Sequence, residues 1–238
     1  MKNNSIEGAK PSVTLASLSA LTATAKLAHS FSTQLIQSAA LFSRLAGKIE
    51  KTSAVKPNGE TIVDYKSYVS GAVFAALSFL EATINELFWA ARDNNEAVKA
   101  LSIEVIEALK SITEENLGRI YILERFQVAL ALARKQLFDR GKTPYQDVNL
   151  LRVLRNALIH YVPEWVGDEP QKLEKILESK FSLSPFHGSA SLFFPHRCLS
   201  HGCAKWAVES SLKFVDDFCK RVGLTPKYDS SSPSLLTE

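Results

Sequence analysis

The stretch YKSYVSGAVFAALSFLEATINELFWAARD, from Tyr65 to Asp93, is apolar on nearly every face of the helix that it would form. A helix of that kind is normally surrounded by other helices or by lipid. Its most apolar part, Val69 to Ala91, approaches the length that spans a membrane. Glu81, Asn85 and Glu86 fall inside it, where contact with lipid would be costly. We therefore predict the buried central helix of a soluble helical domain.

Helical periodicity continues on both sides of this stretch. Glycine and proline are few and lie between periodic segments, and no convincing strand pattern occurs. Thr113 is placed to cap one helix, and Gly141 and Gly223 are placed to stop two others. The fold class predicted is all-α, a helical bundle with antiparallel long helices. Besides the central helix, we expect helices within residues 12–49, 98–112, 117–138, 145–161, 172–179 and 201–222.

The chain of 238 residues is long enough for one large helical domain with a substantial core. We expect residues 1–59 to form N-terminal amphipathic helices that pack on a bundle made by residues 60–223. The serine- and proline-rich residues 224–238 are expected to be a disordered tail. The stretch from Ser182 to Pro195 carries two prolines and a glycine, which indicates a loop or lid.

The overall charge of the chain does not indicate a nucleic-acid partner. The chain has 28 basic and 25 acidic residues, a net charge of +3, so any basic surface must be local. One segment does hold more basic than acidic residues, and it is either an RNA-binding surface or the solvated side of two helices. Its basic residues are Arg119, Arg125, Arg134, Lys135, Arg140, Lys142, Arg152 and Arg155.

The cysteines, Cys198, Cys203 and Cys219, are odd in number and have no framework spacing, which favours a reducing compartment and a cytoplasmic protein. Together with His196 and His201, two of them supply possible zinc ligands, but the spacing matches no common zinc site. We therefore predict core thiols, with no metal and no cofactor. The apolar N-terminal residues 13–25 imitate a signal peptide, but serine, threonine and lysine interrupt them, so neither secretion nor membrane attachment is predicted.

The helix expected at residues 145–161 has two unlike faces. At about 100° per residue, one stripe is apolar and should face the core. It consists of Leu150, Leu151, Leu154, Ala157, Leu158 and Tyr161. The opposite face carries Arg152, Asn156 and His160 as fourth neighbours. Arg155 and the apolar Ile159 flank them.

Two interpretations of this polar face remain open. It can be an ordinary solvated face on which His160 helps to cap the last carbonyls. Alternatively it contacts a partner, because a face built only for water gives no reason for Ile159. Glu81 and Asn85, fourth neighbours on the central helix, either support this face from behind or form an internally satisfied polar pair.

The sequence Arg155-Asn156-Ala157-Leu158-Ile159-His160 near the end of a late helix resembles the motif of the HEPN superfamily, whose name denotes nucleotide binding in higher eukaryotes and prokaryotes. The likeness to its larger single-domain members spans about residues 60–222. It implies a helical bundle that pairs through its motif helices and, in many members, cuts RNA without metal, whereas other members are inactive. Some members carry a tyrosine two places after the histidine as a target of nucleotidyl transfer. Here that place is Val162, and Tyr161 adjoins His160.

The resemblance implies that Arg155 and His160 are catalytic, with Asn156 supporting them. Histidine titrates near neutrality and can move the proton of a 2′-hydroxyl, and arginine can hold the charge that develops on phosphate. Arg152 would add a phosphate contact, and Glu81, Asn85 and Tyr161 would support the site from behind.

Arg155 and His160 are five positions, or about 140°, apart on a regular helix, so one helix cannot aim both at one point. A homodimer with a composite cleft would solve this. The sequence thus predicts a dimeric endoribonuclease in a toxin or defence role, with RNA and an antitoxin or regulatory protein as partners. The alternative is a non-catalytic helical module that binds a nucleotide, RNA or a protein through the same face.

Overall fold

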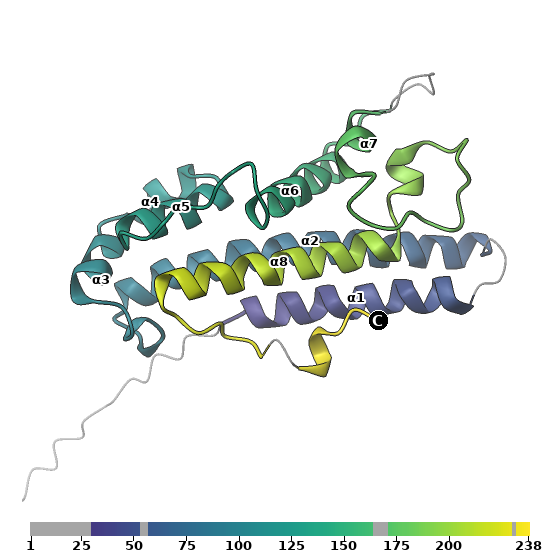
Figure 1. The fold of residues 1–238 in the computed structure, drawn as a ribbon. Helices are drawn as coiled ribbons and strands as arrows, with labels where there is room; N and C mark the ends of the chain where they lie inside the picture. The colour runs from purple at the N-terminus through teal and green to yellow at the C-terminus, as the bar shows by residue number, and fades with distance from the viewer. Residues whose placement is uncertain (1–29, 53–56, 164–170, 230–231) are drawn as a thin grey trace, which may run out of the picture.

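The computed structural model describes residues 30–52, 57–163, 171–229 and 232–238, and within them it is all-α, with no strand. Three long helices lie side by side: α1 (Ser32–Thr52), α2 (Gly59–Arg92) and α8 (His201–Val222). Figure 1 shows that α1 runs antiparallel to α2 and α8. The predicted bundle of antiparallel long helices is confirmed.

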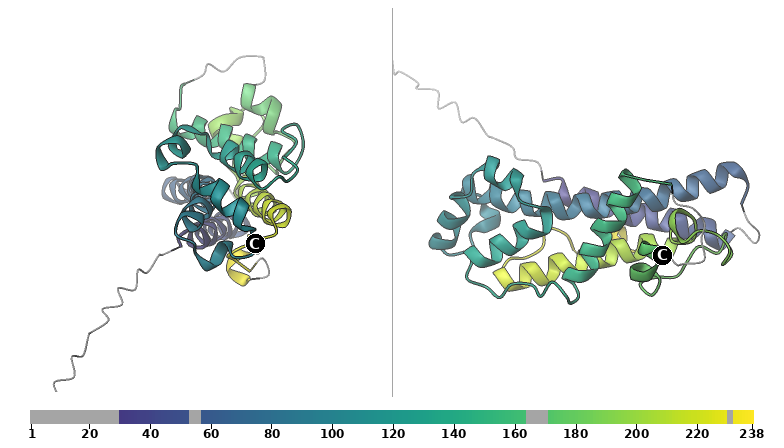
Figure 2. Two further views of the ribbon diagram at one scale, coloured as in Figure 1. Left: turned by 90° about the vertical axis from the view of Figure 1, so that its left-hand side faces the viewer. Right: turned by 90° about the horizontal axis from the view of Figure 1, so that it is seen from above.

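Shorter helices cover one side and both ends of this layer (Figures 1 and 2). The helix α6 (Tyr145–Ile159) packs on α2 and α8 and runs antiparallel to both. At one end lie η1 (Glu96–Val98), α3 (Ile103–Lys110), α4 (Glu114–Arg119) and α5 (Ile122–Leu132). At the other end lie α7 (Lys172–Leu177) and the irregular chain around η2 (Phe193–Arg197), while η3 (Pro233–Leu235) lies against α1.

The central position of α2 follows from its apolar residues. Tyr65, Val69, Phe79 and Ile84 are fully or almost fully buried among α1, α8 and the smaller helices. Within the described residues, α2 is the one helix long and apolar enough to cross a membrane, and 44% of its most apolar window is buried inside the fold. Length and composition of this kind are shared by core helices and spanning helices.

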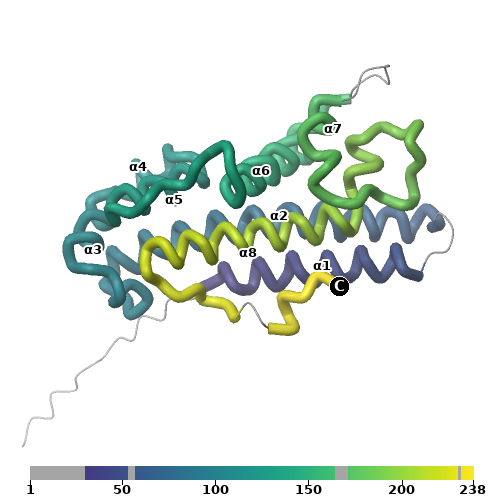
Figure 3. The backbone as a smooth tube through the Cα atoms, in the orientation of Figure 1, coloured from purple at the N-terminus to yellow at the C-terminus, as the bar shows by residue number. Residues whose placement is uncertain are grey.

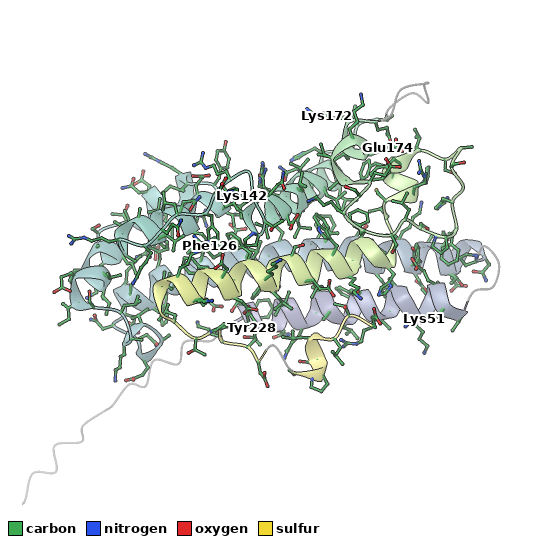
Figure 4. The ribbon with its side chains drawn as sticks, viewed as in Figure 1. Lys51, Phe126, Lys142, Lys172, Glu174 and Tyr228 are labelled. Atoms are coloured by element: carbon green, nitrogen blue, oxygen red, sulfur yellow. The ribbon has the colours of Figure 1, made fainter. Side chains whose placement is uncertain are left out.

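Aromatic packing joins α8 to the short helices above it. Phe126 of α5 contacts Phe214 and Phe218 of α8 edge-on, with ring centroids 4.9 Å apart in both pairs. Phe138 stacks on Phe214 at 4.6 Å. Figure 4 shows Phe126 between the two layers. Edge-on pairs add to the free energy gained from burial, so this cluster fixes α5 on α8.

The predicted caps at Thr113 and Gly223 are confirmed, whereas Gly141 ends no helix, because α5 already ends at Leu132. Thr113 Oγ1 accepts a hydrogen bond from Asn116 N at 3.2 Å and begins α4. Gly223 ends α8 with a φ of +82°, the left-handed conformation that glycine adopts without a Cβ penalty. Ser200 and Asn58 cap α8 and α2 in the same way as Thr113 caps α4.

The single helix predicted for residues 117–138 is wrong. The chain leaves the helical conformation at Ile120, where α4 ends, and again after Leu132, with a positive φ at Arg134. The Gln127 side chain explains the second break. Its amide bonds both N and O of Phe138 at 2.9 Å, so it satisfies the backbone of the extended chain as a neighbouring strand would. The helix predicted at 98–112 begins only at Ile103.

The disordered tail predicted for residues 224–238 is also wrong where the structure describes it. Side chains of α1 and α8 satisfy its carbonyl groups: Ser43 Oγ donates to Thr237 O at 3.2 Å, and His201 Nε2 donates to the same oxygen at 2.9 Å. Leu235 is buried. Figure 3 traces this segment back along α1, which is itself a central helix of the bundle. Of the helices predicted within residues 12–49, the part before residue 30 lies outside the described residues.

Candidate functional site

The helix α6 carries the motif and is anchored by four buried side chains, Tyr145, Val148, Leu151 and Leu154. These residues repeat every third position and face α2 and α8. Leu150, Ala157 and Leu158 are only half-buried, and Tyr161, which we predicted to be in the core, is 49% exposed. Leu151 and Leu154 are therefore core residues as predicted, and Leu150, Ala157 and Leu158 pack against the core from its edge. Tyr161 lies outside the stripe, because α6 ends at Ile159.

Arg155 is half-buried at the edge of a hollow of about 210 Å³ between α6 and α2. The other lining residues are Phe74, Leu77, Ser78, Glu81 and Ile159. Within the described residues, no hydrogen bond or ion pair engages its guanidinium group. Its donors are not used within the described residues, and a guanidinium group with free donors can bind an anion.

Glu81 and Asn85 are held by a third residue, Arg125 of α5, which is 8% exposed. Its Nη1 donates to Asn85 Oδ1 at 2.7 Å and lies 3.5 Å from Glu81 Oε1, and its Nε donates to Ile120 O at 2.9 Å. Glu81 therefore faces the hollow with part of its charge already compensated. Two alternatives were open for Glu81 and Asn85: a polar pair with its hydrogen bonds satisfied, or support of the motif face from behind. Arg125 satisfies the pair, and Glu81 also lines the hollow that Arg155 borders.

His160 follows the last residue of α6 and is exposed. Its backbone N donates to Asn156 O at 2.8 Å, and its φ and ψ of −108° and 48° are not helical. The His160 side chain has no hydrogen bond or ion pair within the part of the chain that is described. It does not line the hollow beside Arg155. Arg155 therefore lines this hollow without His160, its predicted catalytic partner.

The other predicted site residues have separate surroundings. Arg152 is half-buried and donates through Nε and Nη2 to Asn149 Oδ1 at 3.2 and 3.0 Å, within its own helix. The half-buried side chain of Asn156 has no hydrogen bond within the described residues. The Tyr161 ring lies 5.9 Å from that of Phe194 near η2, so it packs away from the hollow.

Apolar side chains surround the Arg155 hollow at the surface. Ile159 is 51% exposed, and Phe74 on α2 is 37% exposed. Both border the hollow, so an arginine lies between two uncovered hydrophobic groups. Ile159 is among the residues that the sequence predicts for this face, and Phe74 is not. Phe74 precedes Glu81 by seven residues and thus shares its helix face, a signal that the sequence did contain.

Half of the basic residues in the segment predicted as a possible RNA-binding surface are paired with acidic side chains. Arg119 pairs with Glu115, Arg140 with Glu124, and Lys142 with Asp139. Arg125 is buried against Glu81. For the part of this segment before α6, these contacts favour an ordinary solvent-exposed helix surface over an RNA-binding surface.

The cysteines are buried core thiols, as predicted. Burial raises the pKa of Cys198 to about 12 and the pKa of Cys203 well above its usual range, so both stay protonated. His201 bonds the tail instead of a thiol. Within the described residues, no group of three or more His, Cys, Asp or Glu side chains could hold a metal ion.

Comparison with known proteins finds no family model, no curated protein and no solved structure that matches this chain.

Proposed function

We propose that this protein is a metal-independent endoribonuclease of the HEPN type, whose active site forms between the α6 helices of two copies. The observation that carries the proposal is Arg155: a half-buried guanidinium group with no partner in the described chain, at the edge of a hollow, five residues before an exposed histidine. A guanidinium group in that setting suits a phosphate ligand. A toxin or defence role in the cytoplasm is part of the same proposal.

The separation of Arg155 and His160 supports a composite site. His160 does not line the hollow that Arg155 borders, so the proposal assigns the histidine beside Arg155 to the second copy. A twofold axis near Ile159 would place His160 of one copy beside Arg155 of the other. The exposed Phe74 and Ile159 would then be buried between the copies.

The chemistry follows from the two side chains. Neutral His160 of one copy takes the proton of a ribose 2′-hydroxyl as O2′ attacks phosphorus. The phosphorus–O5′ bond breaks, O5′ takes a proton from water, and the protonated His160 releases its proton to the solvent. Arg155 stabilises the negative charge on the non-bridging oxygens, and Asn156 donates a hydrogen bond to phosphate or His160. The products are a 2′,3′-cyclic phosphate and a 5′-hydroxyl end.

The test is incubation of the purified protein with mixed RNA in EDTA, followed by analysis of the fragment ends. We expect cyclic phosphate ends, and we expect His160→Ala and Arg155→Ala each to lower the cleavage rate by about a hundredfold or more. Lys213→Ala, which removes an exposed charge from α8, is the matched control and should cleave normally. Intact RNA with the wild-type dimer would overturn the proposal.

A second candidate function is a non-catalytic module that binds a nucleotide, RNA or a protein through the same face. The exposed Phe74 and Ile159 favour it, because apolar groups beside an arginine also suit a protein contact. RNA that binds with an affinity reduced by Arg155→Ala, yet remains uncut, would support this candidate.

A further inference from the structure

A second, larger hollow lies at the end of the bundle where α2 and α8 both finish. Its volume is about 410 Å³, and η1 and the chain after Gly223 close its sides. Most of its lining is apolar, including Phe79, Leu87, Val98, Val215, Phe218 and Leu224. Protein cores are close-packed, so a space of this size leaves those side chains without dispersion partners. It falls within the size range of small-molecule sites.

This apolar hollow opens toward a polar one. A neighbouring hollow of about 500 Å³ shares Glu86, Ala90, Ala97 and Lys227 with it. The outer hollow adds Asn85, Asn95 and Trp89, and Trp89 is 40% exposed. Figure 4 labels Tyr228, which lines the inner hollow, below α8, whereas α6 in Figure 1 lies above it. The pair is thus separate from the Arg155 hollow.

The polar groups of the outer hollow mainly offer hydrogen-bond donors. The acceptor oxygens are already used: Asn85 Oδ1 accepts from Arg125 at 2.7 Å, and Asn95 Oδ1 accepts from Ala97 N at 3.0 Å. Glu86 accepts from Ser30, from the backbone of Phe31, from Ser32 and from Lys227.

The donors are less occupied. Within the described residues, the amide NH₂ groups of Asn85 and Asn95 donate to no acceptor, and Lys227 Nζ uses one of its three donors, on Glu86 at 2.9 Å. The Lys227 side chain is 40% exposed. A ligand that meets this rim is therefore best served by oxygen acceptors.

We propose that the two hollows together bind a small amphiphile, with its apolar body among Phe79, Val215 and Phe218 and an oxygen-acceptor head group at Asn85, Asn95 and Lys227. The inner hollow supplies the apolar area that drives binding. The outer hollow fixes the orientation, because only one end of the ligand can accept hydrogen bonds from its rim.

The experiment measures binding of decanoate to the full chain by isothermal titration and by thermal unfolding. We expect one site per chain, and at ten times its Kd decanoate should raise the unfolding midpoint by about 3–6 °C. Decylamine, which has the same body and a head group without acceptors, should bind at least about tenfold more weakly. RNA cleavage plays no part in this measurement, so its result is independent of the proposed ribonuclease.

Two exposed lining residues give variants that should fold. Ala97→Trp fills the junction of the hollows, and Ala100→Trp fills the side of the inner one. Each should raise the Kd for decanoate at least about tenfold, since a bulky ring displaces the apolar body. Ala131→Trp, at an exposed alanine of α5, is the matched control and should bind as the wild type does.

Absence of heat and of any thermal shift with decanoate would overturn the proposal. Equal binding by the wild type and both filled variants would also overturn it, because decanoate would then bind elsewhere. Decylamine that binds as tightly as decanoate would overturn the assignment of the head group.

Discussion

Leu154 and His160 lie six residues apart at the end of α6 in opposite surroundings: Leu154 is 0% exposed, and His160 is exposed. Leu154→Ala should lower the free energy of unfolding by about 2–5 kcal/mol, because it leaves a cavity in the core. His160→Ala should lower it by no more than about 1 kcal/mol, because the exposed side chain interacts with the helix end only through the helix dipole. Urea denaturation of both variants measures the difference. A His160→Ala variant as unstable as Leu154→Ala would make His160 a structural residue.

The exposure of single residues could be predicted where it depends on their position around one helix. The exposure of His160 and the partial exposure of Ile159 follow from their place on the face opposite the buried leucines. Arg125 was missed as a buried residue and was assigned to a possible RNA-binding surface. Its burial depends on Asn85 and Glu81, which lie about forty residues earlier in the chain, and single-helix periodicity contains no sign of that contact.

The start of α1 is held against α2 by one carboxylate, Glu86. It accepts hydrogen bonds from the Ser30 hydroxyl, from the backbone N of Phe31 and from both N and Oγ of Ser32, and thereby holds the start of α1. Burial raises the pKa of Glu86, but hydrogen bonds from Lys227, Ser30 and Ser32 outweigh it and lower the pKa to about 2.

A carboxylate whose pKa is lower in the folded protein than in the unfolded chain stabilises the fold fully at pH values above the pKa of the unfolded chain. This stabilisation is lost as the pH falls through the pKa of the folded protein. The free energy of unfolding should therefore decrease between about pH 5 and pH 2, by on the order of 2 kcal/mol from Glu86. Glu86→Gln should have a lower free energy of unfolding at pH 7, and this free energy should change less between pH 5 and pH 2 than in the wild type. Denaturant titrations at several pH values measure both. Glu107→Gln, at a side chain that is 62% exposed, is the control. Equal acid slopes in all three proteins would refute the role of Glu86.

At the scale of elements, the sequence predicted helices that are long, periodic and capped, and it failed where side chains replace backbone partners. The helix α8 has the predicted bounds because a serine cap and a glycine stop enclose it. The segment after α5 looked helical, yet Gln127 bonds the backbone of Phe138 and holds it extended. The tail is ordered for a similar reason, since Ser43 and His201 donate to Thr237 O. Such contacts join distant parts of the chain and leave no local pattern.

At the scale of the whole molecule, α2 organises the two candidate sites. One stretch of α2, with Phe74 and Glu81, meets α6 at the Arg155 hollow, and an overlapping stretch, with Phe79 and Glu86, lines the apolar hollow. Arg125 contacts both sides, because it holds Glu81 beside the first and Asn85 beside the second. The apolar stretch that predicted the core therefore also shapes both surfaces, which the sequence pattern alone could not separate.

The composite site requires two copies, and the exposed side chains near α6 show where they should meet. Phe74 and Ile159 flank Arg155, and a charge introduced at either would lose its hydration at an interface. Ile159→Asp and Phe74→Asp should therefore convert the dimer to a monomer at micromolar concentration, as measured by sedimentation velocity.

The matched control is Ile103→Asp, because Ile103 is 76% exposed on α3 and lies outside the Arg155 hollow. That variant should remain a dimer. If Arg155 and His160 act across the interface, a mixture of the inactive Arg155→Ala and His160→Ala chains should regain cleavage, since one of the two composite clefts in a mixed dimer retains both native side chains. A wild-type monomer, or a mixture as inactive as its components, would contradict the composite site and leave Arg155 and His160 to act separately.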